Sequence, residues 1–347
     1  MLRVFITLIL AAAVFFIIVM VIDNNRFVVR NYSVRSPKIK KPLKFVFIAD
    51  LHEKCYRNGN KELIGRIREL APDMILIGGD LIVSANVVRD AKKSEKAGRT
   101  GEGAGAGDRK WMKTSESFIR SISDICPVRF VKGNHELRLD YYEEYREYGE
   151  SFRAAMESAG VRMMGNGFED IDTSILRGYE DGPFERMEER DTGIRICGLE
   201  LPMTYYKKFR KTALYGETLT QLIGDADRSR FNVLLTHSPV YFEQYAEWGA
   251  DLCLCGHVHG GLMRLPVIGG VVGTRPSLFP KYSGGQYFYS VPEGEKICFG
   301  TMVLTCGLGM HTLPIRIFNP GEISVIELKP SLMEGSANNR KQEAAWN

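Results

Sequence analysis

Seven side chains that could bind metal ions lie in short polar clusters along the chain. They are Asp50, His52, Asp80, Asn134, His237, His257 and His259. Carboxylate, imidazole and amide groups without a thiolate form a nitrogen and oxygen ligand set, which suits Mn²⁺, Fe or Zn²⁺. Seven ligands are too many for one ion. We therefore expect two divalent ions that share a bridging carboxylate.

Each cluster directly follows an apolar run that is typical of a buried strand. The runs are Lys44–Ala49, Met74–Gly78, Val128–Val131, Asn232–Leu235 and Asp251–Cys255. In an α/β fold the carboxyl ends of adjacent strands converge at one edge of the sheet, so we expect the clusters to meet there. An extended backbone at the D-x-H and H-x-H pairs would present both members of each pair to one face.

A core histidine is the plain alternative for any single member of this set. Short motifs such as Gly79-Asp80 also occur by chance. Five clusters that each end a strand favour a shared site over five coincidences. The sixth histidine, His311, lies outside the clusters, and we interpret it as a polar loop residue.

The chain begins with an apolar run of 19 residues, Val4–Ile22, that holds no charge. At about 1.5 Å per residue, a helix of this length just spans the hydrocarbon core of a bilayer. A cleaved signal peptide is the alternative, but its apolar region is only roughly 7–15 residues long and ends at an A-x-A pattern, which this run lacks. We therefore predict a single membrane-spanning anchor over residues 1–22.

The net charge of +4 is unevenly distributed. Residues 1–42 hold seven Lys and Arg against Asp23 alone, which leaves a net charge of −2 for residues 43–347. Six of the seven basic residues follow the apolar run, which favours the cytoplasmic face of the cell membrane for the rest of the chain. The basic segment suits a bilayer surface. The slightly acidic body argues against nucleic acid as a partner.

Patterning divides the chain beyond the anchor into four parts. Residues 23–42 are interpreted as a basic linker, 43–328 as one globular domain, 84–112 as a flexible Gly-rich insertion within it, and 329–347 as a polar tail. Strands alternate with helices predicted over Asn60–Leu70, Ser115–Ile125 and Leu139–Ala159, so the class is α/β. Seven cysteines is an odd number and most lie in strand-like runs, so we expect buried thiols and no disulfide partner.

The order of the motifs D-x-H, G-D, G-N-H-E, H and G-H-x-H resembles the calcineurin-like metallophosphoesterase family. The stretches Gly256–Gly270, Phe279–Tyr282 and Gly307–Arg316 look like its membrane-associated bacterial branch. The resemblance covers about residues 43–328. It implies an α/β (α+β) fold in which a two-sheet β-sandwich is flanked by helices in four layers, here preceded by one N-terminal transmembrane helix.

The resemblance also implies a role for each clustered residue. One metal ion would be held by Asp50, His52, Asp80 and His259. The other would be held by Asn134, His237, His257 and the bridging Asp80. A hydroxide between two ions, with Mn²⁺ expected and Fe or Zn²⁺ as alternatives, would attack phosphorus in line. The catalytic residues would be Asp80 and His135, of which His135 would contact the substrate phosphate or protonate the leaving oxygen.

Two departures from the family pattern concern the substrate side of the site. Val83 stands where the family usually has the second Asp of G-D-x-x-D. In the family that Asp orients the acid histidine, so the sequence does not identify the residue that would orient His135. Cys306 stands where related sequences often have Arg. The remaining substrate-binding candidates are Asn134, His135, Arg264 and Arg316, with Lys281 as a further anion anchor.

Three functions are compatible with these patterns. The first is a membrane-anchored phosphoesterase that hydrolyses phosphodiester or diphosphate bonds. The second is the same enzyme acting on a lipid-linked diphosphate or a phospholipid head group, for which an apolar groove beside the metal ions would be diagnostic. The third is a non-catalytic scaffold, although scaffolds tend to lose ligands and all seven are present.

Overall fold

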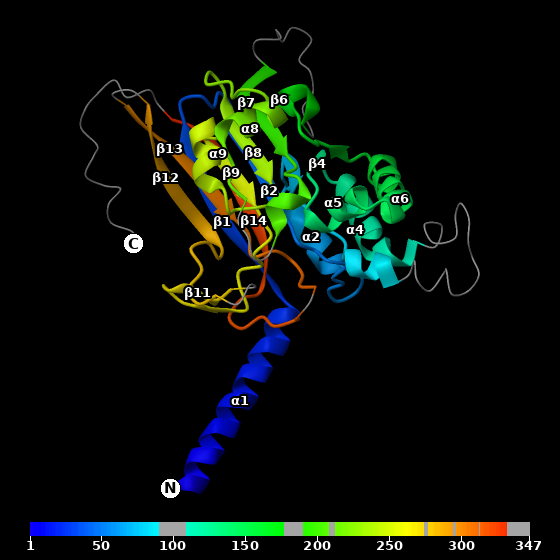
Figure 1. The fold of residues 1–347 in the computed structure, drawn as a ribbon, viewed down its shortest axis with the longest axis vertical. Helices are drawn as coiled ribbons and strands as arrows, with labels where there is room; N and C mark the ends of the chain where they lie inside the picture. The colour runs from blue at the N-terminus through cyan, green and yellow to red at the C-terminus, as the bar shows by residue number, and fades with distance from the viewer. Residues whose placement is uncertain are drawn as a thin grey trace.

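Two six-stranded sheets pack face to face and form the centre of the domain (Figure 1). The computed structural model describes residues 1–89, 109–176, 190–207, 212–273, 277–293, 296–311 and 313–331. The first sheet consists, in spatial order, of β1 (Phe27–Ser36), β14 (Gly321–Pro330), β2 (Leu43–Ile48), β3 (Met74–Ile77), β4 (Val128–Phe130) and β5 (Arg162–Met163).

The second sheet has the same number of strands. Its spatial order is β12 (Gly285–Glu293), β13 (Lys296–Leu304), β9 (Leu252–Cys255), β8 (Phe231–Thr236), β7 (Asp191–Leu199) and β6 (Phe168–Asp172). A separate antiparallel hairpin consists of β10 (Met263–Leu265) and β11 (Gly269–Val272).

Within each sheet, the strands that precede the polar clusters are parallel to one another, whereas β2 is antiparallel to its other neighbour, β14. β2, β3 and β4 run side by side in the first sheet, and β8 and β9 do so in the second. All four residues of β3 and of β9 are buried, as expected for strands covered on both faces. The five strands predicted before the clusters are confirmed, and their carboxyl ends meet at one edge of the sandwich.

Helices cover the outer faces of both sheets and complete four layers. The first sheet is covered by α2 (Lys61–Glu69), α4 (Lys113–Ser123) and α6 (Arg146–Ser158), with α5 (Asn134–Tyr141) beside them. The second is covered by α8 (Gly216–Ile223) and α9 (Phe242–Trp248). Short 3₁₀ turns are η1 (Arg109–Met112), η2 (Glu143–Tyr145), η3 (Thr173–Ile175) and η4 (Met203–Tyr206). The four-layer sandwich implied by the resemblance is confirmed.

Three apolar clusters hold the layers together. The middle cluster lies between the sheets, where Phe45 and Phe47 of β2 face Val233 and Leu235 of β8, all of them buried. Each outer cluster lies between one sheet and its helices. Burial of this apolar surface is the main stabilising contribution, at roughly 25 cal/mol per Å².

Helix α1 (Leu2–Asn24) projects from the domain as a single rod (Figure 1). It is long and apolar enough to cross a membrane, with a mean hydropathy of 3.2 and no part of its most apolar window buried by the domain. A signal sequence near the N-terminus can meet the same criteria of length and hydropathy. The helix therefore has the properties of either an anchor or a signal.

The segment predicted as a basic linker is mostly a strand. β1 pairs in parallel with β14 over its whole length, from Phe27 beside Gly321 to Ser36 beside Pro330. Apolar side chains lie on both faces of β1. Phe27 and Val29 pack against the outer cluster, whereas Tyr32 packs between the two sheets. The basic side chains hid this alternation, and β1 is an edge strand, where such charges are common.

Two further predictions differ from the structure. The segment Leu139–Ala159, predicted as one long helix, belongs to two helices, because the backbone of Tyr142 is extended and ends α5. The break was not predicted because no Gly or Pro lies there. The insertion predicted over 84–112 has packed ends, with Val87, Trp111 and Met112 buried in the outer core. Residues 90–108 and 332–347, and with them most of the predicted insertion and tail, lie outside the described residues.

Candidate metal centre

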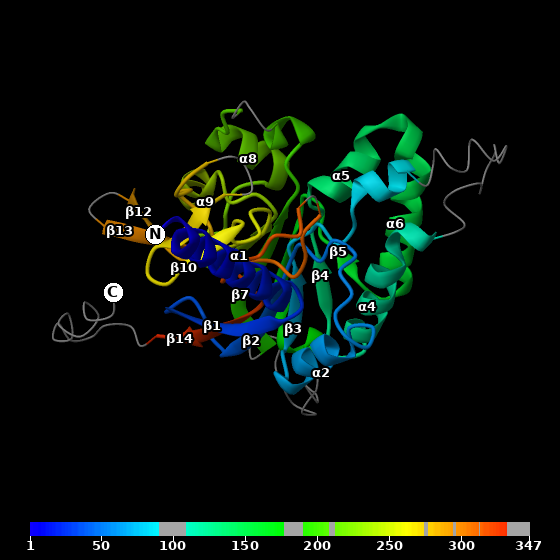
Figure 2. The same cartoon turned by 90° about the horizontal axis from the view of Figure 1, so that it is seen from below.

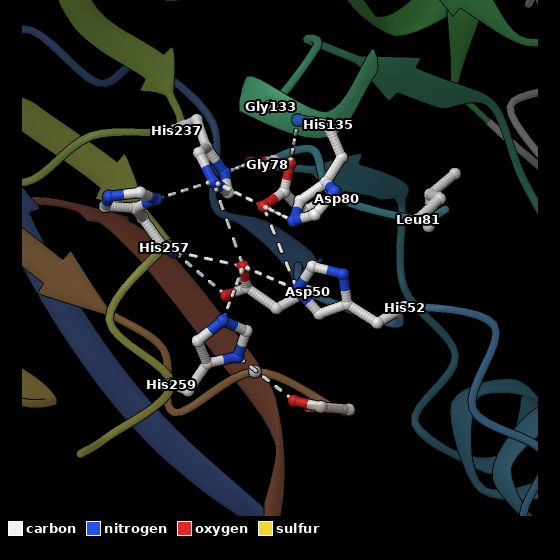
Figure 3. A network of polar contacts seen from close by, with 12 residues as sticks. Asp50, His52, Gly78, Asp80, Leu81, Gly133, His135, His237, His257 and His259 are labelled. Carbon is white, nitrogen blue, oxygen red and sulfur yellow. Dashed lines mark hydrogen bonds and ion pairs between the residues drawn. The ribbon is translucent and has the colours of Figure 1, made fainter. Parts of the chain in front are cut away.

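The predicted metal ligands come from loops that follow four strands and from the start of one helix. Asp50 and His52 follow β2, Asp80 follows β3, and His237 follows β8. His257 and His259 follow β9, and Asn134 and His135 begin α5. Figure 3 shows six of these side chains pointing toward one centre, with His135 beside them.

Three groups of side chains in the described part of the chain could hold a metal ion, and one of them consists of His52, His135 and His311. Six of the predicted ligands form the other two. In one, ligand atoms of Asp50, His52 and His259 all lie within 4.8 Å of one another. In the other, ligand atoms of Asp80, His237 and His257 do the same. The sequence prediction that these six residues converge is confirmed.

Asp80 lies between the two groups. Its Oδ2 atom is 3.0 Å from Nε2 of His237 and 3.8 Å from Nε2 of His52. The same oxygen is 4.0 Å from Nε2 of His135. Asp80 thus faces candidate ligands of both groups, as a bridge would, and Oδ1 of Asp50 also lies 3.9 Å from Nε2 of His237 in the other group.

Main-chain carbonyls fix the orientation of three of the imidazole rings. Nδ1 of His237 is 2.7 Å from the carbonyl oxygen of Gly78, and Nδ1 of His259 is 3.0 Å from that of Gly309. Nδ1 of His52 is 3.2 Å from the carbonyl oxygen of Ile82. Because a carbonyl only accepts, each Nδ1 carries a proton. At His52 and His259 the Nε2 lone pair then faces the centre, as a metal ligand requires. Nε2 of His237 lies 3.0 Å from Oδ2 of Asp80, so it donates to that carboxylate and would give up this proton to bind a cation.

Five of the candidate ligands have backbone conformations that are costly for L-residues. The φ angles are +54° at Asp50, +49° at His52, +55° at Asp80, +78° at His257 and +52° at His259. The extended backbone that we predicted for the D-x-H and H-x-H pairs is therefore wrong. The pairs still reach one centre, because left-handed turns direct their side chains inward. Such strain concentrates at functional sites.

Two glycines let the loops approach the carboxylates closely. A Cβ atom on Gly133 would lie 2.2 Å from Oδ1 of Asp80, and one on Gly256 would lie 2.8 Å from Oδ2 of Asp50. Any side chain there would displace a carboxylate from the centre. Glycine is therefore required at both positions by space rather than by φ.

Glu136 holds two of the loops together, and sequence reasoning did not assign it this role. Its Oε2 accepts hydrogen bonds from the backbone N–H groups of Asp80, at 2.9 Å, and Gly133, at 3.0 Å. Its Oε1 accepts from Leu81 at 2.8 Å and Ile82 at 3.2 Å. The spacing was a usable signal, because Glu136 is the third residue of α5 and its carboxylate accepts from the backbone N–H of the N-cap residue Gly133, as the acidic residue of a capping box does.

Ser84 takes the place of the missing aspartate beside His135. The backbone N–H of Ser84 donates to Nδ1 of His135 at 3.0 Å, and its Oγ lies 3.0 Å from the same atom. An Nδ1 that accepts a hydrogen bond leaves the imidazole proton on Nε2, the nitrogen that faces Asp80. A carboxylate at position 83 would accept a hydrogen bond from Nδ1 of His135, whereas Ser84 donates to Nδ1. The substitution therefore moves the imidazole proton from Nδ1 to Nε2.

His311 belongs to the site, contrary to its interpretation as an outlying loop residue. Its ring centroid is 4.7 Å from that of His52 and 4.6 Å from that of His135. It is exposed and lies in the loop that follows β13, so it lines the open side of the centre. No motif marked it, because its position depends on the path of this long loop.

Electrostatics favour the metal-binding protonation state at some of the candidate ligands and oppose it at others. Burial acts to lower the pKa of His237, but the neighbouring Asp80 outweighs it and raises that pKa to about 9, and burial raises the pKa of Asp50 to about 7. Burial lowers the pKa of His52 and of His259 well below the usual value, so both imidazoles are neutral. Burial acts to raise the pKa of Asp80, but the neighbouring His237 and His135 outweigh it and hold that pKa well below its usual value. An ionised carboxylate among neutral imidazoles is the form that binds a divalent cation.

The two arginines predicted to bind substrate support the main chain instead. Arg316 is buried, and its Nη2 donates to the carbonyls of Cys306, Gly307 and Gly309 at 2.8 to 3.2 Å. Arg264 donates to the carbonyl of Ser283 at 2.6 Å. Lys281 pairs with Glu243 at the surface. These contacts use the guanidinium donors that a substrate phosphate would need, so the geometry does not support a substrate role for either arginine.

The donor set fits divalent cations. Nε2 of His52 and Oδ1 of Asn134 are buried and have no hydrogen-bond partner within the described part of the chain. Leaving a buried polar atom unpaired costs about 1–3 kcal/mol, which a bound cation would offset. The residues that could hold two ions are those of the two groups together with Asn134.

Comparison with known proteins agrees with this geometry. The profile of the calcineurin-like phosphoesterase family matches residues 43–261. The metallophosphoesterase YkuE of Bacillus subtilis is 32% identical over 82% of this chain and 79% of its own length. A metallophosphoesterase of Campylobacter jejuni is 24% identical over 87% of this chain.

The match to the Campylobacter protein is limited in coverage, and a match to a solved structure is limited in identity and TM-score. The chain spans 63% of the length of the Campylobacter protein. A dimetal phosphatase from Danio rerio aligns with 76% of this chain and 87% of its own, at 12% identity and a TM-score of 0.34. The profile match covers more than half of the chain and includes all seven metal-ligand candidates. This chain belongs to the calcineurin-like phosphoesterase family.

Proposed function

We propose that the protein is a membrane-anchored phosphoesterase that uses two divalent metal ions to hydrolyse phosphodiester or diphosphate bonds. The observation that supports a pair of ions is the position of Asp80, whose Oδ2 lies 3.0 Å from His237 and 3.8 Å from His52. A single carboxylate shared between two ligand groups is typical of dinuclear hydrolase sites. The apolar helix α1 supports the anchor.

The side chains of this centre have separable tasks. Two divalent cations, when bound, activate water and neutralise negative charge on the phosphoryl oxygens. His135 carries its proton on Nε2, because Nδ1 accepts from Ser84, and can donate a hydrogen bond to a phosphoryl or leaving-group oxygen. Of the two roles implied for His135, contact with the phosphate is the one that this tautomer favours.

Hydrolysis of bis-(p-nitrophenyl) phosphate by the full chain with added Mn²⁺ tests the proposal. We expect Asp80→Ala to abolish the activity because it removes the shared ligand. Asp124→Ala is the matched control, since Asp124 is exposed at the end of α4, and it should leave the rate unchanged. A metal-loaded wild-type protein that is no faster than Asp80→Ala would support the scaffold hypothesis instead.

A lipid-linked substrate is favoured by a groove next to the centre. A cavity of about 250 Å³ is lined by His257 and, beside it, by Pro239, Val240, Val258, Pro280 and Tyr282. These apolar side chains offer an acyl chain or other hydrocarbon a surface beside the phosphate site. This is the feature that separates lipid-linked substrates from small polar esters.

The comparison of two substrates with the same phosphate group tests this second proposal. We expect kcat/KM to be higher for a diacylglycerol-linked diphosphate in mixed micelles than for its short-chain analogue. Val240→Asn should lower the value for the lipid substrate alone. Equal values for both substrates in the wild type would contradict a lipid preference without affecting the proposed hydrolysis.

A further inference from the structure

Loops on the side of the domain from which α1 leaves (Figures 1 and 2) carry a set of exposed apolar side chains. We call it the apolar rim, and it consists of Val267, Ile268, Leu278, Phe279, Leu313 and Phe318. The first two form the turn of the β10–β11 hairpin, and the others lie in two neighbouring loops. Val267 is fully exposed, and Leu278 and Phe279 are 72% and 63% exposed. Large apolar groups gathered on one face mark an interaction surface.

We propose that the apolar rim inserts into the bilayer leaflet next to α1, so that the domain is held against the lipid surface at a fixed height. The inference rests on the proposed membrane anchor. It adds a second attachment, made by the domain itself, at the boundary between head groups and acyl chains.

The loop that carries Leu313 and Phe318 is fixed to the end of α1. The backbone N–H of Asn319 donates to the buried carboxylate of Asp23 at 2.9 Å. Nδ2 of Asn24 donates to the carbonyl of Pro314 at 2.6 Å. The position of this loop along the helix axis is therefore set by the structure and not by a free linker.

The depth of Phe318 follows from its neighbours on α1. Its ring centroid is 6.3 Å from that of Phe15 and 6.4 Å from that of Phe16. Phe15 precedes Asp23 by eight residues, which corresponds to about 12 Å along the helix at 1.5 Å per residue. The apolar run is only just long enough for a core of about 30 Å, so it cannot be withdrawn by that distance and still span. Any placement in which α1 spans the bilayer therefore puts the Phe318 ring within lipid.

The hairpin lies at the same level as Phe318. A cavity of about 570 Å³ is lined by Phe318 together with Leu265, Pro266, Val267 and Ile268 of the hairpin. Three basic side chains, those of Arg30, Arg264 and Lys281, line the same cavity. Arg30 pairs with Glu322 and Lys281 with Glu243, so Arg264, which donates to main-chain carbonyls, is the cation among them without an acidic partner in the described part of the chain. Apolar groups with adjacent cations match the acyl boundary and the anionic head groups of a bilayer.

The position of the rim has a consequence for the metal centre. Pro280 and Lys281 line this cavity and also the apolar groove that contains His257. A rim seated in lipid would therefore place one end of that groove at the bilayer surface. A lipid-linked substrate could reach the centre without leaving the membrane completely.

Tryptophan fluorescence of the full chain tests the proposal. The protein is reconstituted in phosphatidylcholine and phosphatidylglycerol vesicles, with or without phosphatidylcholine that bears a doxyl quencher at carbon 5 of the acyl chain. Ile268→Trp and Leu278→Trp report on the rim. Phe15→Trp reports on α1, and Phe168→Trp is the matched control, since Phe168 is 54% exposed on β6 at the end of the domain far from α1. The signal of the parent protein, in which Trp111 and Trp248 are buried, is subtracted.

We expect quenching at residues 15, 268 and 278 and none at residue 168. Quenching at residue 15 with none at 268 and 278 would overturn the insertion of the rim while leaving the anchor intact, and would assign the rim to a protein partner or a second copy. No quenching at residue 15 would overturn both the anchor and the rim. Hydrolysis of the soluble diester at the parent rate shows that each variant is folded, because none of these residues lies at the metal centre.

Discussion

Glu136→Gln is the perturbation that best separates the support of the site from its chemistry. The carboxylate accepts four backbone N–H groups, two at each oxygen. An amide of the same shape has one oxygen, so it can satisfy only two of them. Its NH₂ group then faces two buried N–H groups that have no acceptor. At about 1–3 kcal/mol for each unsatisfied buried group, the free energy of unfolding falls by roughly 4 kcal/mol.

The same variant should weaken metal binding. The N–H groups of Asp80 and Gly133 belong to the loops that hold the bridging carboxylate and Asn134, so these loops lose their common anchor. For a domain of this size, a loss of roughly 4 kcal/mol corresponds to a fall in Tm of about 10 °C. Differential scanning calorimetry measures the shift, and titration of the apoprotein with Mn²⁺ measures the affinity.

Glu143→Gln is the matched control, because that side chain is 76% exposed in η2. It should change neither quantity. A Tm for Glu136→Gln within about 2 °C of the wild-type value, together with unchanged Mn²⁺ affinity, would refute the role assigned to the four hydrogen bonds.

Three further predictions concern single side chains. His135→Ala should lower kcat by about 100-fold or more with metal content unchanged, since His135 is not among the expected ligands; loss of metal would contradict this. His311→Ala should raise KM more than it lowers kcat, because the exposed ring lies 4.6 Å from that of His135 on the open side of the centre; unaltered steady-state kinetics would exclude it from the site. Partial burial acts to raise the pKa of Asp191, but hydrogen bonds from Lys40, the backbone and Arg230 lower it to about 2. The ionised Asp191 therefore stabilises the folded protein above pH ~4, and this contribution is lost as the pH falls toward 2. The side chain is partly exposed, so Asp191→Asn should lower the free energy of unfolding by no more than about 1 kcal/mol at pH 7 and by progressively less on acidification, as measured by urea unfolding; a difference that grows at low pH would be inconsistent with this sign.

The sequence was sufficient to predict the features that depend on local patterns. Apolar runs located the strands β2, β3, β4, β8 and β9, and the polar residues after them are the candidate ligands that the structure brings together. These predictions succeeded because a buried parallel strand is a continuous apolar run, and because its carboxyl end has a fixed place in the sheet.

The features that were missed depend on contacts distant in sequence. β1 becomes a strand by pairing with β14, nearly three hundred residues away, and its basic side chains resemble those of a linker. Ser84 and His311 reach His135 through loop geometry that no motif encodes. The left-handed backbone at Asp50 and His52 is held by hydrogen bonds to the neighbouring loop, where the N–H groups of both residues donate to the carbonyls of Gly79 and Asp80. Local preference alone would favour the opposite sign of φ.

The stoichiometry of metal binding tests the central claim most directly. The full chain, purified with Mn²⁺ and freed of excess metal, is analysed by inductively coupled plasma mass spectrometry beside Asp80→Ala and Asp124→Ala. We predict two ions per chain for the wild type and for Asp124→Ala, and fewer than two for Asp80→Ala. A wild-type protein that binds one ion or none, or an Asp80→Ala variant that retains two, would contradict a dinuclear centre bridged by Asp80.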